Sequence, residues 1–436
     1  MPTTEVDDPT LTLLENLVSP CTGVLRRTLL LPYTGGQIRY SHATAAPARY
    51  GVLPTGGDIA NPGASAWHMP RSLTQVAFEA VERYCAAFVD HGSMLRTAPQ
   101  GPAFDAGRRV QQFAAHQYAA PGFPFVPLRD GSVVHWALGR SLLTGDRRYV
   151  PAAFTYLPFR PTSPDEVLGP SFSTGMSAAW TREAACLSGL LELVERDAFA
   201  ITWLNRLPGR RIVPAPGSTM ALRVAAVEAD GASRVTLLDV RTDIDVPVVC
   251  AVLERHVTGR RLMAVGLSCK LDVATACDKA LCEAISEYER LRVVLEDEAR
   301  TGPWTPAPDF SDVVDFEWHG RVYTDPQRQD QLSFLLGDGT ATEVDGDLRE
   351  TRPGDLVRAL RLVEPVVSDV VAVDLTTRDM HELGVTAVKV FAPELVPLNA
   401  DHRYPYLGHD RLLRAAGRRA VAATPADLNP YPHPFS

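Results

Sequence analysis

The sequence predicts a mixed α/β (or α+β) fold, and two observations support this prediction. Three segments show helical periodicity with few helix breakers: Leu73–Asp90, Thr181–Arg206 and Val273–Asp297. Strand-like runs rich in β-branched residues stand before, between and after these segments. The predicted strands are Gly23–Leu31, Arg234–Val240, Val246–Leu253, Arg261–Val265, Ser368–Leu375 and Val385–Phe391. Interspersed helices and strands argue against an all-α or all-β fold.

Two stretches between these elements are predicted to lie outside the core. Thr301–Pro308 is rich in proline, which has no backbone N–H and a fixed φ, so we expect a connection. Gln327–Asp355 is polar and acidic and contains several glycines, so we expect a surface insertion.

Composition and charge exclude several classes of protein. The net charge of −9 provides no basic surface for binding nucleic-acid phosphates. The first residues, MPTTEVDDPT, do not resemble a secretion signal, and no apolar run reaches the roughly 20 residues that a membrane span needs. The seven cysteines form no C-x-x-C pair, so each is predicted to be a buried free thiol. These features predict a cytoplasmic protein that binds neither nucleic acid nor membranes.

Two of the predicted helices carry the same short motif, E-x-x-E-R. It is formed by Glu79, Glu82 and Arg83 in the first helix and by Glu192, Glu195 and Arg196 in the second. A looser version, Glu283-Ala-Ile-Ser-Glu287, follows in the third helix. Residues i, i+3 and i+4 share one helix face, so each motif brings two carboxylates together. On an exposed helix such a motif is only a solvated face with ion pairs, which is the alternative interpretation.

The surroundings of the two motifs favour a binding site. Apolar residues flank the glutamates in both helices, and a helix that is apolar on most of its circumference is largely buried. Buried carboxylate pairs need more positive charge than two arginines supply. Mg²⁺ prefers oxygen ligands and commonly binds together with nucleotide phosphates. The sequence therefore predicts a Mg²⁺–nucleotide site, and it is not a P-loop because G-x-x-x-x-G-K-[ST] is absent.

The chain ends in alternating prolines, Pro430-Tyr-Pro432-His-Pro434-Phe-Ser436. Prolines at alternate positions favour an extended, polyproline-like conformation. Terminal segments of this kind are commonly disordered or bind an aromatic groove, which is the alternative interpretation. A stiff segment at the end of the chain could instead hold the α-carboxylate of Ser436 at a fixed point, where it could act as a base.

Together these residues resemble the YcaO family, and in particular its azoline-forming branch. The segment Ser173–Asp197, STGMSAAWTREAACLSGLLELVERD, is similar to the family signature S-x-G-x-A-A-x-T-x-x-E-A…E-x-x-E-R-D. The alternating prolines resemble the ending of the azoline-forming members. The resemblance implies an N-terminal segment over residues 1–64 and a YcaO domain over residues 65–436, with mixed sheets and helices around a central ATP pocket.

The resemblance also implies which residues bind ATP and Mg²⁺. The metal-linked carboxylates would be Glu79, Glu82, Glu192 and Glu195. The nucleotide contacts would be Gln75, Glu79, Arg83, Ser188, Glu192, Arg196, Glu283 and Arg290, although spacing does not decide between Arg290 and Arg292. The catalytic tail would comprise Pro430, Pro432, Pro434 and Ser436.

The activity implied by the resemblance is ATP-dependent ring formation in ribosomally made precursor peptides, such as those of bacteriocins. Cys, Ser or Thr residues would become thiazolines or oxazolines through phosphorylation of the backbone amide oxygen. The expected partners are the precursor peptide and an E1-like or ThiF-like leader-binding protein, because the chain has no room for a fused leader-binding half. A flavin dehydrogenase as a further partner, and a homodimer, are left open.

Two other functions are also left open. A YcaO enzyme could form a thioamide or amidine from the same activated amide, although the proline tail argues against it. A catalytically degenerate member could serve only as a scaffold in a biosynthetic complex. The segment Ala66–Pro70 keeps this alternative open, because it stands where the family has a glycine-rich lead-in. Gln75 and Phe78 also depart from the family pattern.

Overall fold

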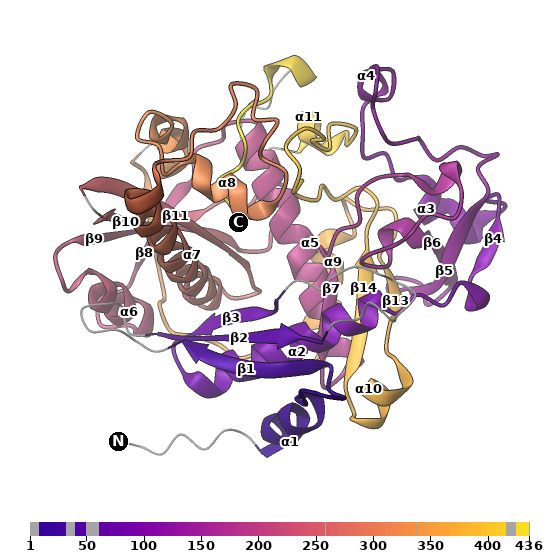
Figure 1. Cartoon of the computed structure of the whole chain (residues 1–436), viewed down its shortest axis with the longest axis horizontal. Coiled ribbons are helices and arrows are strands. Elements are labelled where there is room, and N and C mark those ends of the chain that lie inside the picture. Colours follow the sequence, from indigo (N-terminus) through magenta and orange to yellow (C-terminus); the bar gives the residue numbers. More distant parts are fainter. Residues whose placement is uncertain are drawn as a thin grey trace. The chain divides into compact units, whose positions relative to one another are not determined.

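The structure is a computed structural model that describes residues 8–31, 40–48, 61–257, 259–337, 339–415 and 424–435 (Figure 1). It confirms the mixed α/β fold and divides the chain into two compact units. Of the described residues, unit 1 comprises those up to Leu193 together with Gly354–Leu395, and unit 2 comprises Val194–Pro353 and those from Val396 onward. The predicted boundary at residue 64 is a different division of the chain and stays a prediction.

Unit 1 contains two antiparallel sheets. The three-stranded sheet has the order β1-β2-β3, and the six-stranded sheet has the order β4-β5-β13-β14-β7 with β6 paired to β5. The strands are β1 (Leu25–Leu31), β2 (Ser41–Pro47), β3 (Gly63–Ala66), β4 (Leu95–Thr97), β5 (Val134–Ser141), β6 (Arg147–Pro151), β7 (Met176–Ala179), β13 (Val371–Asp374) and β14 (Thr386–Phe391). The α-helices are α1 (Asp8–Leu17), α2 (Met69–Ala87), α3 (Asp105–Arg108), α4 (Ala115–Tyr118), the first part of α5 (Arg182–Leu204), α9 (Asp355–Val363) and α10 (Arg378–Glu382).

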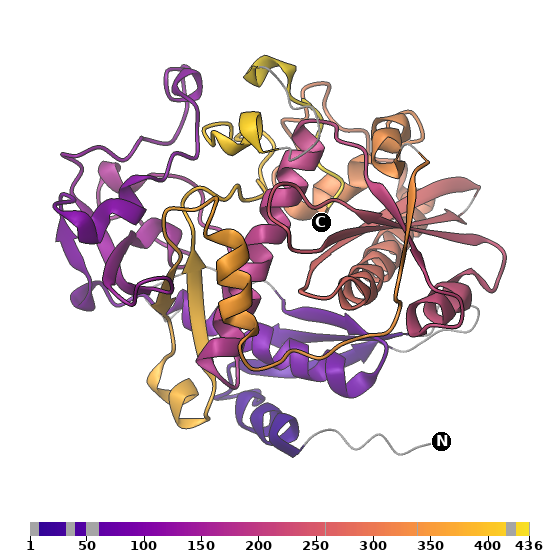
Figure 2. The ribbon, with the colours of Figure 1, turned by 180° about the vertical axis from the view of Figure 1, so that it is seen from behind.

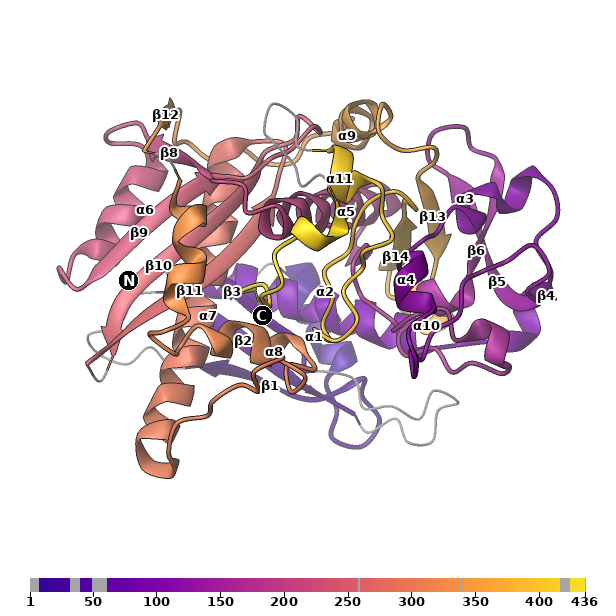
Figure 3. The same cartoon turned by 90° about the horizontal axis from the view of Figure 1, so that it is seen from above.

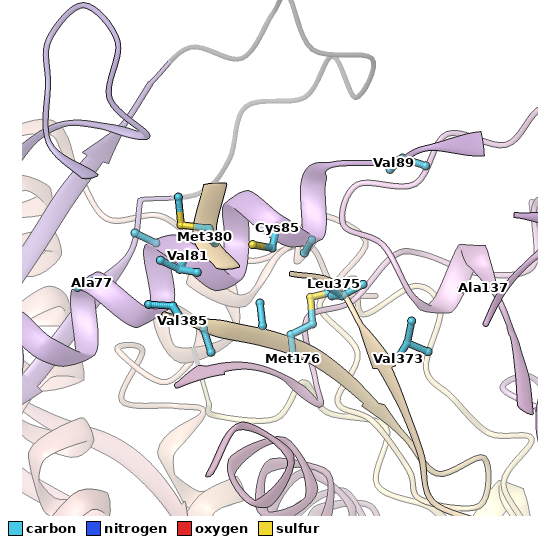
Figure 4. Packing of buried hydrophobic residues seen from close by; sticks show 14 of the residues in the cluster. Ala77, Val81, Cys85, Val89, Ala137, Met176, Val373, Leu375, Met380 and Val385 are labelled. Atoms are coloured by element: carbon cyan, nitrogen blue, oxygen red, sulfur yellow. The ribbon is translucent and has the colours of Figure 1, made fainter. Parts of the chain in front are cut away.

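Helix α2 forms because apolar residues recur on one of its faces at the spacing of a helix turn. Val76, Ala77, Ala80 and Val81 are all buried. Figure 4 shows this buried face over β7, β13 and β14. The helix starts four residues earlier than predicted, because Pro70 fits the first turn of a helix, where no N–H is needed.

Helix α5 has residues in both units. Its first part, up to Leu193, belongs to unit 1 and the rest to unit 2. Figure 2 shows α9 beside the unit 1 part of α5, and the Gly354 N–H at the start of α9 donates to Glu183 Oε1 on α5 at 3.2 Å.

Unit 2 contains a five-stranded sheet in the order β11-β10-β9-β8-β12. The strands are β8 (Arg210–Pro214), β9 (Ser233–Asp239), β10 (Val248–Val257), β11 (Arg260–Cys269) and β12 (Ala341–Val344). The α-helices besides α5 are α6 (Thr219–Glu228), α7 (Val273–Thr301), α8 (Phe316–Val322) and α11 (Arg411–Arg414). Helix α7 packs on β10 and β11. A Cβ at Gly266 of β11 would lie 2.2 Å from the Ala280 carbonyl oxygen of α7, so glycine permits this close approach.

Two predictions about local structure are corrected. The segment Gln327–Asp355 is not only a surface insertion: its strand β12 pairs in parallel with β8, and its Leu332 and Leu335 are buried. Its polar composition hid this because β12 is a largely exposed edge strand. All seven cysteines are free, but Cys21 is exposed rather than buried. Within the described residues, no helix combines the length and apolar character that a membrane crossing requires.

Candidate functional site

The first E-x-x-E-R motif lies on α2 in unit 1 and forms one charged group. Arg83 approaches Glu79 Oε1 at 3.6 Å and Glu82 Oε1 at 3.7 Å. The Gly63 N–H donates to the other oxygen of Glu79 at 3.1 Å. The side chain of Glu82 is only 16% exposed. The motif is therefore not a solvated helix face.

Glu192 of the second motif belongs to the same unit and is held by a loop. The Gly175 N–H donates to Glu192 Oε2 at 2.9 Å. The loop is fixed in turn by Lys389 of β14, whose Nζ donates to the carbonyls of Phe172 and Thr174 at 3.0 and 2.8 Å. The ammonium group also lies 4.2 Å from the centre of the Phe172 ring. Lys389 thus positions the loop that positions Glu192.

Burial changes the ionisation of two groups in this cluster. It raises the pKa of Glu82 to about 8; Arg83 opposes this shift, and the charges of Glu192 and Glu79 add to it. Burial lowers the pKa of Lys389 to about 7, against the attraction of Glu192 and Glu82. The predicted convergence of Glu79, Glu82 and Glu192 is therefore present within unit 1, with Lys389 added to it.

Glu195 and Arg196 of the second motif belong to unit 2. Glu195 is buried, and its Oε2 accepts the Cys269 N–H at 2.8 Å at the end of β11. Arg196 lies 3.5 Å from Glu195 Oε1. Burial lowers the pKa of the neighbouring Lys270, while Glu195 opposes this shift.

Other residues predicted to bind nucleotide have varied surroundings. Gln75 lies one turn before Glu79 on α2, and Ser188 is exposed one turn before Glu192 on α5. Glu283 of α7 pairs with Lys279 at 3.4 Å. Arg290 forms two hydrogen bonds with Glu287, at 2.7 and 2.8 Å. Arg292 pairs with Glu289 and Glu296. Both arginines are thus engaged on α7, and the choice between them stays a prediction.

The cluster in unit 1 fits a metal–nucleotide ligand in the chemistry of its donors. Gln75 Oε1 and Arg83 Nε are buried without a hydrogen-bond partner, as expected of groups that face a polar ligand. The carboxylates are hard oxygen donors of the kind that Mg²⁺ prefers. Among the described residues, no three His, Cys, Asp or Glu side chains form a ready-made metal cage. Mg²⁺ rarely uses such a cage, because phosphates and waters supply most of its ligands.

The sequence contained a signal for the lysines that our predictions did not use. Of its 43 lysine and arginine residues, only three are lysines: Lys270, Lys279 and Lys389. Each interacts with a glutamate of the predicted nucleotide site. A compact ammonium group can be buried and neutralised, whereas a guanidinium stays charged. The rarity of lysine therefore distinguishes these three positions as candidates for the neighbourhood of the site.

Asp197, which follows Arg196 in the signature, is structural. It is fully buried and accepts two hydrogen bonds from Arg411, at 2.9 and 2.6 Å. It also accepts the Val396 N–H at 3.0 Å. Asp243 binds the other side of the Arg411 guanidinium. Asp197 thus holds two segments of unit 2 that follow β14, one at Val396 and one at Arg411.

The proline-rich tail is ordered up to Phe435 and lies between α5 and α8 (Figure 3). Pro432, His433, Pro434 and Phe435 are buried. The guanidinium carbon of Arg196 lies 4.2 Å from the centre of the Phe435 ring. The alternative of a disordered tail is therefore wrong for residues 429–435. Ser436 lies outside the described residues, so the role of its carboxylate stays a prediction.

Solved structures with a similar fold include the following three. A heterocyclase in complex with substrate and cofactor has a TM-score of 0.76 and 21% identity, covering 98% of this chain and 57% of that chain. The YcaO protein from Methanopyrus kandleri, bound with AMPPCP and Mg²⁺, has a TM-score of 0.61 and 19% identity, covering 88% and 90%. The E. coli microcin synthetase McbBCD complex has a TM-score of 0.56 and 14% identity, covering 84% and 87%.

An uncharacterised protein of Methanothermobacter thermautotrophicus is 29% identical over 268 residues, which are 59% of this chain and 65% of the relative. The chain thus spans less than two thirds of the length of this relative and of the heterocyclase.

The family model described as YcaO cyclodehydratase, ATP- and Mg²⁺-binding, matches residues 69–396. This description confirms the expected cofactors, ATP and Mg²⁺. Because the match covers most of the chain and includes both E-x-x-E-R motifs, the protein belongs to the YcaO family.

Proposed function

We propose that this protein is the ATP-using subunit of a peptide cyclodehydratase that converts Cys, Ser or Thr of a precursor peptide into azolines. The observation that carries the proposal is the placement of the tail. Its last described residue, Phe435, lies against Arg196 of the second E-x-x-E-R motif. A tail that lies beside a residue predicted to bind ATP is well placed to take part in the ATP-dependent reaction.

The reaction closes a ring and removes one water. The side-chain thiol or hydroxyl attacks the preceding backbone carbonyl carbon and loses its proton to a base, for which the terminal carboxylate is the predicted acceptor. The resulting oxyanion takes the γ-phosphoryl group of ATP. Phosphate then departs with that oxygen as the amide N–H proton is lost and the C=N bond forms. Without phosphorylation the amide oxygen is a poor leaving group.

The residues predicted to hold Mg²⁺ are Glu79, Glu82, Glu192 and Glu195. When bound, Mg²⁺ offsets charge on the phosphoryl oxygens, which is the main electrostatic task in phosphoryl transfer. Arg83 and Arg196 would bind phosphate or brace the carboxylates. Gln75, with its unpartnered buried oxygen, would contact the nucleotide.

The test combines the protein with a candidate precursor, a leader-binding partner and Mg·ATP, and follows product mass. We expect the loss of one water per ring formed. A truncation that lacks Tyr431–Ser436 should bind nucleotide normally but form no rings. Ring formation by this truncated enzyme at the wild-type rate would remove the tail from the mechanism.

The same assay separates the two alternatives. Exchange of the amide oxygen for sulfur or nitrogen, in place of water loss, would identify a thioamide- or amidine-forming enzyme. Failure to bind Mg·ATP, together with an unchanged phenotype of Glu192→Ala, would identify a scaffold protein.

A separate leader-binding protein is the proposed partner. The proposal is supported by the E. coli microcin synthetase, because the chain of similar fold was solved as part of the McbBCD complex. Omission of the E1-like partner from the assay should leave basal ATP binding intact and abolish ring formation on a precursor that carries its leader.

A further inference from the structure

Consecutive carbonyls of the tail are each contacted by a side chain from elsewhere in unit 2. His402 Nε2 lies 3.0 Å from the Pro430 oxygen, and Trp203 Nε1 on α5 donates to the Tyr431 oxygen at 2.8 Å. The hydroxyl of Tyr323, directly after α8, donates to the Pro432 oxygen. We propose that Trp203, Tyr323 and His402 are positioning residues that fix the register of the tail. This inference rests on the proposed function, in which the tail acts in the reaction.

The chemistry of proline explains why side chains must do this. Pro430, Pro432 and Pro434 have no backbone N–H, so the tail cannot be held in place by strand pairing. Its carbonyls remain as acceptors, and a carbonyl shielded from water, such as that of Pro432, needs a donor from the protein. Indole N–H groups only donate, and a hydroxyl or imidazole facing a carbonyl must donate as well. The three contacts therefore have one direction, from the protein body to the tail.

The contacts also fix a register. Neighbouring carbonyls of a polyproline-like segment point in different directions, because this conformation has about three residues per turn. The three donors come from three separate segments of unit 2. A shift of the tail by one residue would misalign all three donors at once. The indole, phenol and imidazole groups thus fix the position of residues 430–432 along the direction of the tail.

The start of the tail is fixed independently. The Asn429 N–H donates to the Leu204 oxygen at 2.7 Å, and the Asn429 side chain donates to the Trp203 oxygen at 3.2 Å. His433 stacks on His319, with ring centres 3.9 Å apart, and its Nε2 lies 3.0 Å from the Asn399 oxygen. These contacts hold both sides of the segment when a single one of the three donors is removed, so a single variant disturbs the position of the carbonyls between them without releasing the tail.

His319 is not counted among the donors. Its two ring nitrogens lie 3.1 Å from the His433 oxygen and 2.9 Å from the Ala400 oxygen. Burial lowers its pKa to about 4, with the nearby His402 acting in the same direction, so the ring is neutral at pH 7 and carries a single N–H. It can donate to only one of the two carbonyls.

The test removes the donors one at a time, and Tyr323→Phe does so without changing the ring. Tyr323→Phe and Trp203→Phe each delete one donor, and His402→Leu deletes the third. We expect kcat for ring formation to fall about two- to tenfold in each single variant, in line with the loss of one hydrogen bond, with the KM for ATP unchanged. His402→Gln keeps an N–H at the end of the side chain and should restore kcat. Tyr288→Phe on α7 is the control, a buried tyrosine away from the tail.

Each result decides between positioning and general structural damage. A fall in kcat without a change in nucleotide affinity, at a wild-type melting temperature in Tyr323→Phe and His402→Leu, together with rescue by His402→Gln, supports the inference; Trp203→Phe also shrinks a buried side chain, so only its nucleotide affinity is compared. Wild-type kcat in the donor variants, with an inactive truncation at residue 431, overturns the inference and leaves the proposed function intact. Equal losses of kcat, nucleotide binding and thermal stability also overturn it. Full activity of the truncation overturns the proposed function itself.

Discussion

At the scale of the residue, Glu82 links the proposed metal site to pH. Its carboxyl group is shielded from water on α2, and this burial raises its pKa to about 8. At pH 7 the group is therefore mainly protonated before a metal ion arrives. A metal ion needs the carboxylate, so binding must displace the proton.

The first prediction follows from this displacement. Below pH 8, binding of Mg·ATP should release a proton, and the apparent affinity should rise with pH until about pH 8. Calorimetric titrations in buffers of different ionisation enthalpy measure the released protons directly. Glu82→Gln should abolish the buffer dependence, and the exposed Glu350→Gln should not. Buffer-independent heats in the wild type would rule out Glu82 as the group that is deprotonated.

The second prediction concerns Lys389 and stability. Burial lowers its pKa to about 7, whereas an unfolded lysine remains protonated up to about pH 10.5. Between these values folding releases a proton from Lys389, so rising pH favours the folded state. The free energy of unfolding of the wild type should therefore rise relative to that of Lys389→Met by about 1.4 kcal/mol per pH unit between pH 7 and 9.

Urea denaturation at pH 7, 8 and 9 measures this difference. Lys279→Met, which removes a partly exposed amine on α7, is the matched control and should follow the wild type. Parallel pH dependence of Lys389→Met and wild type would show that the amine is charged in the folded protein.

At the scale of the element, two glycines let α5 approach the loop before β7. A Cβ at Gly189 would lie 2.6 Å from the Gly175 oxygen and 2.9 Å from a methyl group of Val390. Gly175 itself has a φ of +86°, which disfavours other residues. This contact sets where the Gly175 N–H meets Glu192 one turn further along α5.

The third prediction is that Gly189→Ala destabilises the protein. Alanine is favoured over glycine in a helix by about 1 kcal/mol. The clash with backbone should outweigh this gain and lower the free energy of unfolding by about 1–3 kcal/mol. Gly131→Ala, where a Cβ meets nothing within 4 Å, is the control. A variant as stable as the wild type would mean that the loop at Gly175 can move away from the new methyl group without lowering the free energy of unfolding.

The same elements show how far the sequence could be interpreted without the structure. Long amphipathic patterns predicted α2, α5 and α7 well, because burial of one face dominates their stability. Strand β12 was missed because its exposed edge position leaves no apolar pattern, and its pairing with β8 depends on residues far away in sequence. The glutamates of the predicted site were selected because their motif repeats in the sequence, and the structure brings Glu79, Glu82 and Glu192 near one another in unit 1. Lys389 was missed because a lone lysine in a strand looks like an exposed charge.

At the scale of the whole molecule, ligand binding and folding are coupled. A ligand that binds only the folded chain stabilises all of it, by about 2.7 kcal/mol at a hundredfold excess over its Kd.

The fourth prediction is that a non-hydrolysable ATP analogue raises the melting temperature only when Mg²⁺ is present. Thermal denaturation with and without EDTA measures this, and Glu192→Gln should lose the effect while Glu350→Gln keeps it. An equal shift in EDTA would place the nucleotide at a site without metal.

The scarcity of lysine has a practical consequence for labelling this protein in solution. Amine-reactive reagents find only three side-chain targets: Lys389, which is fully buried, Lys270, whose amine is buried enough to lower its pKa, and Lys279, whose side chain is 24% exposed. Acylation of the accessible Lys279 amine therefore modifies the chain beside Glu283. Mass spectrometry after brief acylation should report whether nucleotide is bound, whereas immobilisation through Lys279 would attach the protein beside its predicted nucleotide site.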